Sequence, residues 1–155
     1  MVSVVYFDTS ALLKYYVAEI GSSWVNALLS SSPAPVVFIS QLTIVESSCA
    51  FARRLREGVL SPTIYADLLT AFDYDLNYKY TVVDVMPVII DTARQLAGRH
   101  PLRAYDALQL ATSWLINKEL LRVNKPPLTF FSADDRLITI AQAEGLLTNN
   151  PNHHP

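Results

Sequence analysis

The chain has 155 residues, which is enough for one domain with a hydrophobic core. Hydrophobic residues make up 51% of the chain, but no apolar run reaches the roughly 18 residues that a membrane span requires. The net charge of −2 argues against a protein that coats nucleic acid through many basic side chains. The arginines are clustered, however, so the charge does not exclude an enzyme that acts on nucleic acid.

The first half of the chain predicts strands that alternate with helices. Val2–Phe7 is almost entirely apolar, lacks the basic start of a secretory signal, and suits a strand buried on both faces of a parallel sheet. A short helix follows, which Ser10 can cap and which ends near Tyr16. The next predicted elements are a helix over Gly21–Ser31, a strand over Val36–Ile39 and a helix over Leu42–Glu57 that Gly58 ends.

The second half continues the alternation. Ser61 and Pro62 begin a helix in the preferred way, with a capping serine followed by proline in the first turn. The whole pattern predicts one α/β domain over residues 1–148, with a parallel sheet covered on both faces, and a loose tail over residues 149–155. The remaining predicted elements are strands over Tyr80–Val83, Leu128–Phe131 and Leu146–Thr148, and helices over Pro87–Arg99, Arg103–Leu121 and Asp134–Glu144.

Four acidic residues stand out because each lies in apolar sequence near the end of a strand or the start of a helix. A buried carboxylate is costly unless it is paired, protonated or bound to a metal. In parallel α/β sheets, ligands bind beyond the carboxyl ends of the strands, so acids at these points can converge. The sequence therefore predicts one acidic pocket for a hard divalent cation, formed by Asp8, Glu46, Asp106 and Asp134.

Each of these acids also has a purely structural interpretation. Asp8 could form a turn or cap, Glu46 could pair with Arg53, and Asp106 could stabilise a helix N-terminus. Ser132 and Asp135 have the spacing of a capping box, which would leave Asp134 free to face the sheet edge. Cys49 is the single cysteine, so the chain can form no internal disulfide, and we expect a protein of the reducing cytoplasm. We expect Cys49 itself to be buried in the core as a small hydrophobic residue.

Four stretches, in this order, resemble the PIN-domain ribonucleases and most closely the VapC-type toxins of prokaryotic toxin–antitoxin pairs. The resemblance covers nearly the whole chain, and the ordered set is far more specific than any one motif. The stretches are VYFDTSALLKYY over residues 5–16, SQLTIVE over 40–46, LRAYDALQLA over 102–111 and FFSADDRL over 130–137.

The resemblance implies a three-layer α/β/α sandwich around a central, mostly parallel sheet of four or five strands. It assigns the four acids to the family's catalytic and metal-binding quartet, and Ser10 and Ser132 to hydroxyl positions beside the first and last acid. Gln109 stands where many relatives carry histidine. The implied activity is a Mg²⁺- or Mn²⁺-dependent endoribonuclease, with an antitoxin protein as partner and a homodimer as the assembly.

Ligands that are all oxygen atoms favour Mg²⁺ or Mn²⁺ over zinc. We expect Asp8 and Asp106 to be the main ligands and Glu46 and Asp134 to bind a second ion or act through water. The candidates for phosphate contacts are Arg53, Arg99 and Arg103. Two other classes of function remain open. One is a module that binds RNA or protein without catalysis, and the other is a phosphatase that uses an aspartate nucleophile, although such enzymes carry a second acid where this chain has Ser10.

Overall fold

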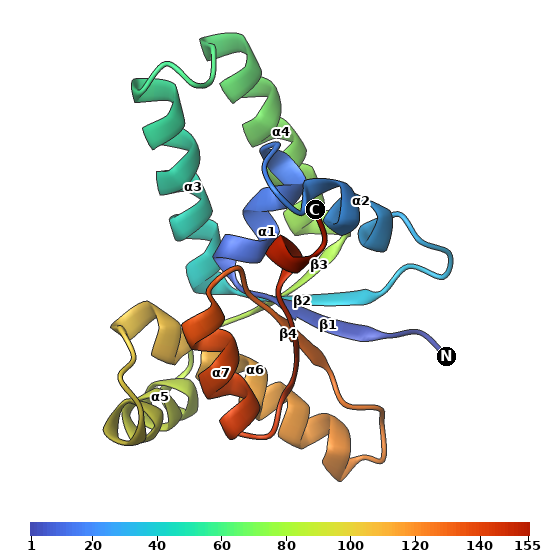
Figure 1. Ribbon diagram of the computed structural model, residues 1–155, viewed down its shortest axis with the longest axis vertical. Coiled ribbons are helices and arrows are strands. Elements are labelled where there is room, and N and C mark those ends of the chain that lie inside the picture. Colours follow the sequence, from blue (N-terminus) through green and yellow to red (C-terminus); the bar gives the residue numbers. More distant parts are fainter.

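The computed structural model describes all 155 residues, and its elements alternate along the chain as the sequence predicts. Five parallel strands form one sheet in the order β3-β2-β1-β4-β5 (Figure 1). None of the helices has the length and apolar composition needed to cross a bilayer. The strands are β1 (Val4–Phe7), β2 (Val36–Ser40), β3 (Tyr80–Val83), β4 (Thr129–Phe131) and β5 (Leu147–Asn149). The helices are α1 (Thr9–Tyr16), α2 (Ser22–Leu29), α3 (Gln41–Arg56), α4 (Pro62–Tyr78), α5 (Pro87–Arg99), α6 (Ala104–Arg122), α7 (Asp135–Ala143) and the 3-10 helix η1 (Pro151–His153).

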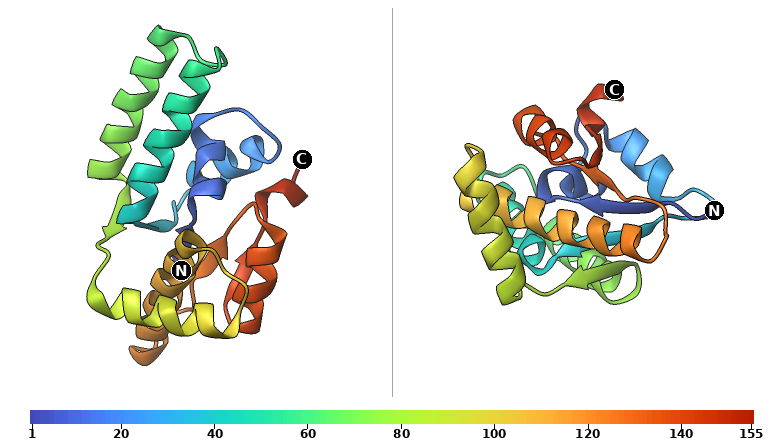
Figure 2. Two further views of the ribbon diagram at one scale, coloured as in Figure 1. Left: turned by 90° about the vertical axis from the view of Figure 1, so that its left-hand side faces the viewer. Right: turned by 90° about the horizontal axis from the view of Figure 1, so that it is seen from below.

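Two hydrophobic cores lie on opposite faces of the sheet, because successive strand residues point in opposite directions. Tyr6 and Phe130 pack with α5, α6 and α7, whereas Phe7 and Phe131 pack with α1 to α4. Rings that are in register on β1 and β4 also stack, with 4.8 Å between the Phe7 and Phe131 centroids. Figures 1 and 2 show the two groups of helices on either side of the sheet. The predicted three-layer α/β/α architecture is confirmed.

Helices α3 and α4 form a long hairpin that extends beyond the sheet (Figure 1). Gly58 follows α3 with a φ of 73°, a conformation that glycine adopts without steric cost. The Ser61 hydroxyl accepts the backbone N–H of Ile64 at 3.2 Å, and Pro62 occupies the first helical position. Both ends of the hairpin turn were predicted correctly, because the signals that set them are local in the sequence.

The caps of α1 and α7 differ from the sequence prediction. Asp8, not Ser10, is the N-cap of α1, and Asp134, not Ser132, is the N-cap of α7; each carboxylate accepts a backbone N–H from the first turn of its helix. Asp135 therefore completes no capping box. Aspartate and serine cap helices about equally well, so local sequence cannot choose between them. Here the serines are engaged with Asp8, which leaves the acids to cap.

The last residues are packed against the domain, in contrast to the loose tail that the sequence suggests. Asn150 and Pro151 are buried, and residues 151–153 form η1. The ring of His154 stacks on Trp24 of α2, with 4.2 Å between the ring centroids. The tail is held by contacts with α2, a segment more than a hundred residues earlier, which no local pattern reveals.

Gly21→Ala is expected to destabilise the protein because it breaks this packing. Gly21 has a φ of 84°, and a Cβ atom there would lie 2.3 Å from the Pro151 carbonyl oxygen. Gly58→Ala is the matched control, since it has a φ of 73° but nothing near its Cβ. The control should lose about 1–2 kcal/mol from the φ strain alone. Denaturant unfolding should show a clearly larger loss for Gly21→Ala, and equal losses would mean that the tail does not pack here.

Candidate active site

Asp8 lies where the carboxyl ends of β1 and β4 meet. Its backbone N–H donates to the Phe131 carbonyl at 3.0 Å. Its side chain is buried, and both carboxylate oxygens accept hydrogen bonds from hydroxyl groups. Ser10 donates to one oxygen at 2.7 Å and Ser132 donates to the other at 2.6 Å. Asp8 forms no salt bridge, so its orientation is fixed entirely by neutral donors.

The environment of Asp8 disfavours its charge. Burial raises the pKa of Asp8 from its ordinary value of 3.8 to about 6, and the negative charge of Glu46 adds to this effect. The hydrogen bonds from Ser132, Ser10 and the Ala11 backbone oppose the rise only in part. An acid held in this way gains stability when a cation approaches it.

Glu46 lies early in α3 and is also held by neutral donors. Thr9 and the Gln109 amide each donate to Glu46 Oε1 at 2.9 Å. The Tyr6 hydroxyl donates to Gln109 Oε1 at 2.6 Å, which turns the amide nitrogen toward Glu46. The salt bridge between Glu46 and Arg53 that the sequence left open does not form. Sequence reasoning missed the roles of Thr9 and Tyr6, because only the folded chain brings them beside Glu46.

Asp106 and Asp134 form the second part of the acidic group. Asp106 lies in the first turn of α6 and is half-buried. Burial raises the pKa of Asp106, the charge of Asp134 raises it further, and Arg103 opposes the rise. Partial burial also acts on Asp134, but hydrogen bonds from the backbone and guanidinium of Arg136 outweigh it and hold the pKa of Asp134 below its ordinary value. Asp134 is the one acid of the four with a salt bridge, at 3.4 Å to Arg136.

The four acids therefore interact as two pairs, Asp8 with Glu46 and Asp106 with Asp134. No three acidic, histidine or cysteine side chains lie close enough together to form a complete metal-ligand set. The donor chemistry nevertheless fits a hard cation, since all four groups offer carboxylate oxygens and three of them lack a cationic partner. One pair of carboxylates with water ligands is enough to hold Mg²⁺, which commonly takes only one or two carboxylates directly.

An open groove of about 850 Å³ borders this acidic group. Glu46 lies in its wall with Thr9 and Ser10, and the predicted cations Arg53 and Arg103 also line it. The groove thus places acidic and basic groups on one surface, as a site for a phosphodiester requires. Its other lining residues are Leu13, Leu42, Val45, Cys49, Ala50, Arg56 and Tyr105.

Two sequence predictions about individual side chains are corrected here. Cys49 is exposed on the groove wall and is not a buried hydrophobic residue, because the face of α3 that it shares with Glu46 borders the groove and not the core. Arg99 is committed to Glu144, with 3.1 Å between Nη2 and Oε2. This pairing at the end of α5 leaves Arg99 a poor candidate for phosphate binding.

Comparisons with known proteins agree with the fold. The sequence matches the PIN domain family over residues 5–141. It is 32% identical over 142 residues to ribonuclease VapC45 of Mycobacterium tuberculosis, and the match covers 92% of each chain. Among solved structures it resembles Mycobacterium tuberculosis VapC20, described as a toxin that cleaves the sarcin–ricin loop, with a TM-score of 0.63, 17% identity and coverage of 94% of this chain and 97% of that one.

A second solved structure, FitAcB from Neisseria gonorrhoeae, has a TM-score of 0.64, 16% identity and coverage of 96% of this chain and 99% of that chain. Both structural matches share the fold at low identity, whereas the match to VapC45 extends to the sequence itself. From the family match, the curated relative and the observed sheet order, the chain belongs to the PIN domain family, in its VapC-type branch.

Proposed function

We propose that this protein is a metal-dependent endoribonuclease and the toxin of a type II toxin–antitoxin pair. The observation that carries the proposal is that Asp8 and Glu46 interact at the carboxyl end of β1 and that neither they nor Asp106 forms a salt bridge with a lysine or arginine. Carboxylates that serve only the fold are normally neutralised by such partners. The relationship to ribonuclease VapC45 supplies the substrate class.

The proposed roles follow from what holds each acid. Asp8 is rigid, since two serines fix its oxygens, and it is assigned with Asp106 as a main metal ligand. Glu46 presents its second oxygen from the groove wall, and Asp134 sits beside Asp106; both are assigned to the second ion or to a metal-bound water. Ser10 and Ser132 orient Asp8.

When bound, Mg²⁺ or Mn²⁺ would supply an activated water and positive charge for the leaving oxygen. The net reaction is hydrolysis: water oxygen joins phosphorus, the bond from phosphorus to the ribose 3′-oxygen breaks, and a 5′-phosphate and a 3′-hydroxyl remain. Arg53 and Arg103 lie where they can contact the substrate backbone along the groove.

The phosphatase alternative is less well supported by the site. An aspartate nucleophile needs a second carboxylic acid two residues later, and that position holds Ser10, which donates its hydroxyl proton to Asp8. An acyl-phosphate trapped on Asp8 would favour the phosphatase. A binding module without catalysis remains a possible outcome of the cleavage assay.

The proposed partners are an antitoxin and a second copy of the chain. A small protein encoded beside this gene and purified with it would support the antitoxin, and a chain that is harmless when expressed alone would argue against it. The mass of the free protein in solution tests the homodimer.

A cleavage assay on mixed cellular RNAs tests the proposed function directly. The purified protein should cut RNA in Mg²⁺ or Mn²⁺ and stop when EDTA removes the metal, because the metal would lower the pKa of the attacking water and stabilise the leaving oxygen. Mapping the new ends should give 5′-phosphates. Cleavage that persists in EDTA would exclude the proposed chemistry, and binding of RNA without cleavage would favour the non-catalytic module.

A further inference from the structure

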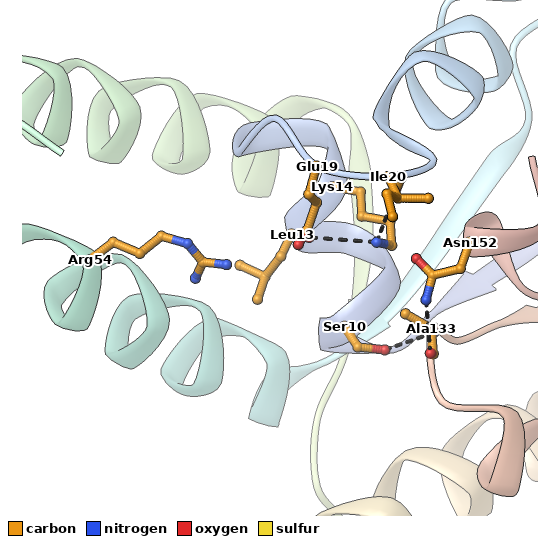
Figure 3. A pocket seen from close by; sticks show the side chains of 8 residues that line it. All are labelled: Ser10, Leu13, Lys14, Glu19, Ile20, Arg54, Ala133 and Asn152. Atoms are coloured by element: carbon orange, nitrogen blue, oxygen red, sulfur yellow. Dashed lines mark hydrogen bonds and ion pairs between the residues drawn. The ribbon is translucent and has the colours of Figure 1, made fainter. Parts of the chain in front are cut away.

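A second hollow, of about 380 Å³, lies beside the groove and has a different chemical character (Figure 3). It shares two residues of α1, Ser10 and Leu13, with the groove. Ser10 also contacts Asp8, so an extended ligand that lies against the acids can continue into this hollow. The other residues that line it are Lys14, Glu19, Ile20, Arg54, Ala133 and Asn152.

Lys14 is the unusual residue of the hollow, because its side chain is only 5% exposed yet has few partners. Its ammonium donates to the Ile20 carbonyl at 2.8 Å, which is its single hydrogen bond. The nearest carboxylate, that of Glu19, lies 3.7 Å away, which is beyond hydrogen-bond distance. An ammonium has three N–H donors, and buried charges normally use them. Lys14 therefore keeps donor capacity for an anion.

Arg54 provides a second cation. It reaches from α3 toward Leu13 (Figure 3). Its only hydrogen bond is a long one of 3.5 Å to the Ala50 carbonyl in its own helix, and no carboxylate pairs with it. Its neighbour Arg53 lines the groove, which Leu13 also borders. Helix α3 thus places arginines along both hollows.

We infer that the hollow binds a backbone phosphate of the RNA, next to the one that is cleaved; this rests on the proposed ribonuclease function. A phosphate offers several acceptor oxygens, enough for the free donors of Lys14 and the fork of Arg54 together. The link through Ser10 to Asp8 favours a ligand that also spans the acidic site. The negative charge of Glu19 in the wall reduces the positive potential of the hollow, so a free anion would bind weakly. A phosphate that belongs to an RNA strand is held there also by the contacts of the rest of the strand.

The test measures binding of a short single-stranded RNA to the cleavage-impaired Asp106→Asn protein by fluorescence anisotropy across a salt series. Lys14→Met and Arg54→Met should each weaken binding on the order of tenfold. Each should also reduce the slope of log Kd against log salt by about 0.7, the value for one lost single-strand phosphate contact. Lys125→Met is the matched control, since Lys125 is an exposed lysine before the amino end of β4 and pairs with no acid. It should change neither quantity.

Glu19→Gln separates phosphate binding from a structural role of the Lys14–Glu19 pair. If the hollow binds phosphate, removing the negative charge should tighten RNA binding. If the pair serves only the fold, Glu19→Gln and Lys14→Met should lower the melting temperature and leave the salt slope unchanged, which overturns the inference. Arg54→Met and Glu19→Gln decide the matter if Lys14→Met does not fold.

A substrate series locates the contact. Replacing single phosphates of the RNA with neutral methylphosphonates should reveal one position at which the modification and Lys14→Met are not additive. Additive effects at every position would contradict a direct contact. If the wild type cleaves RNA and the variants bind RNA as tightly as the wild type, the phosphate subsite is contradicted but the ribonuclease function stands. A wild type that neither binds nor cleaves RNA would remove both.

Discussion

Asp106→Asn is expected to reduce RNA cleavage by about a hundredfold or more while the fold is kept. Replacing a residue that only supports a metal ligand commonly costs 10–100-fold in metal affinity or activity, so loss of a ligand itself should cost at least as much. Asp106 is half-buried on the first turn of α6 and forms no salt bridge, so neutralising it breaks no ion pair, and burial already disfavours its charge. Asparagine keeps the shape of the side chain and removes the charge.

The matched control is Asp91→Asn, which neutralises an exposed aspartate on α5 that is loosely paired with Arg94 at 3.8 Å. Initial rates on one RNA at a fixed Mg²⁺ concentration should be unchanged for this control. Circular dichroism and the melting temperature establish that both variants are folded. Undiminished cleavage by a folded Asp106→Asn protein would contradict the metal site and the mechanism built on it.

The alternation of strands and helices and the parallel sheet could be predicted because their signals are either local or simple. Val4–Phe7 is apolar on both faces, which only a central parallel strand requires, and Gly58 and Ser61 mark helix ends within a few residues. The rule that ligands bind beyond the carboxyl ends of parallel strands directed attention to Asp8, which lies at that edge. These features depend on the pattern of the sequence alone and not on specific tertiary contacts between side chains.

What the sequence could not predict are the contacts between distant segments. Whether Ser10 or Asp8 caps α1 depends on Ser132, which lies 124 residues from Asp8 and donates to it. Gln109 was noted only as a departure from the family pattern, yet it links Tyr6 to Glu46. Lys14 showed no signal, because its burial depends on the loop that contains Glu19 and Ile20. In each case tertiary packing determines the hydrogen-bond partner, and no periodic pattern in the sequence indicates which residue it is.

The second large effect is expected in the free energy of unfolding, because both metal and pH should act on the carboxylate of Asp8. The pKa of Asp8 is about 6 in the folded, metal-free protein, whereas its ordinary value is 3.8. The folded state therefore binds the proton more tightly than the unfolded chain. The resulting stability is fully present below the unfolded pKa and is lost as the pH rises through about 6. By the size of this shift, the loss is on the order of 3 kcal/mol.

Bound Mg²⁺ or Mn²⁺ should oppose that loss, because a cation compensates the buried charge that forms as the pH rises. At a metal concentration of about one hundred times Kd, binding to the folded state alone adds roughly 2.7 kcal/mol to the free energy of unfolding. Denaturant unfolding at several pH values, with metal and with EDTA, measures both effects. The stabilisation by metal should be small below the pH at which Asp8 ionises and reach its full size above it.

Asp8→Asn separates this site from the rest of the protein. Asparagine caps a helix about as well as aspartate and can still accept the Ala11 N–H, but it neither titrates nor offers a charged ligand. The variant should lose the fall in stability near pH 6 and most of the gain from metal, whereas Asp91→Asn should keep both. An equal gain from metal in wild type and Asp8→Asn would place the cation elsewhere, and a metal-binding role would then no longer explain why Asp8 is buried without a cationic partner.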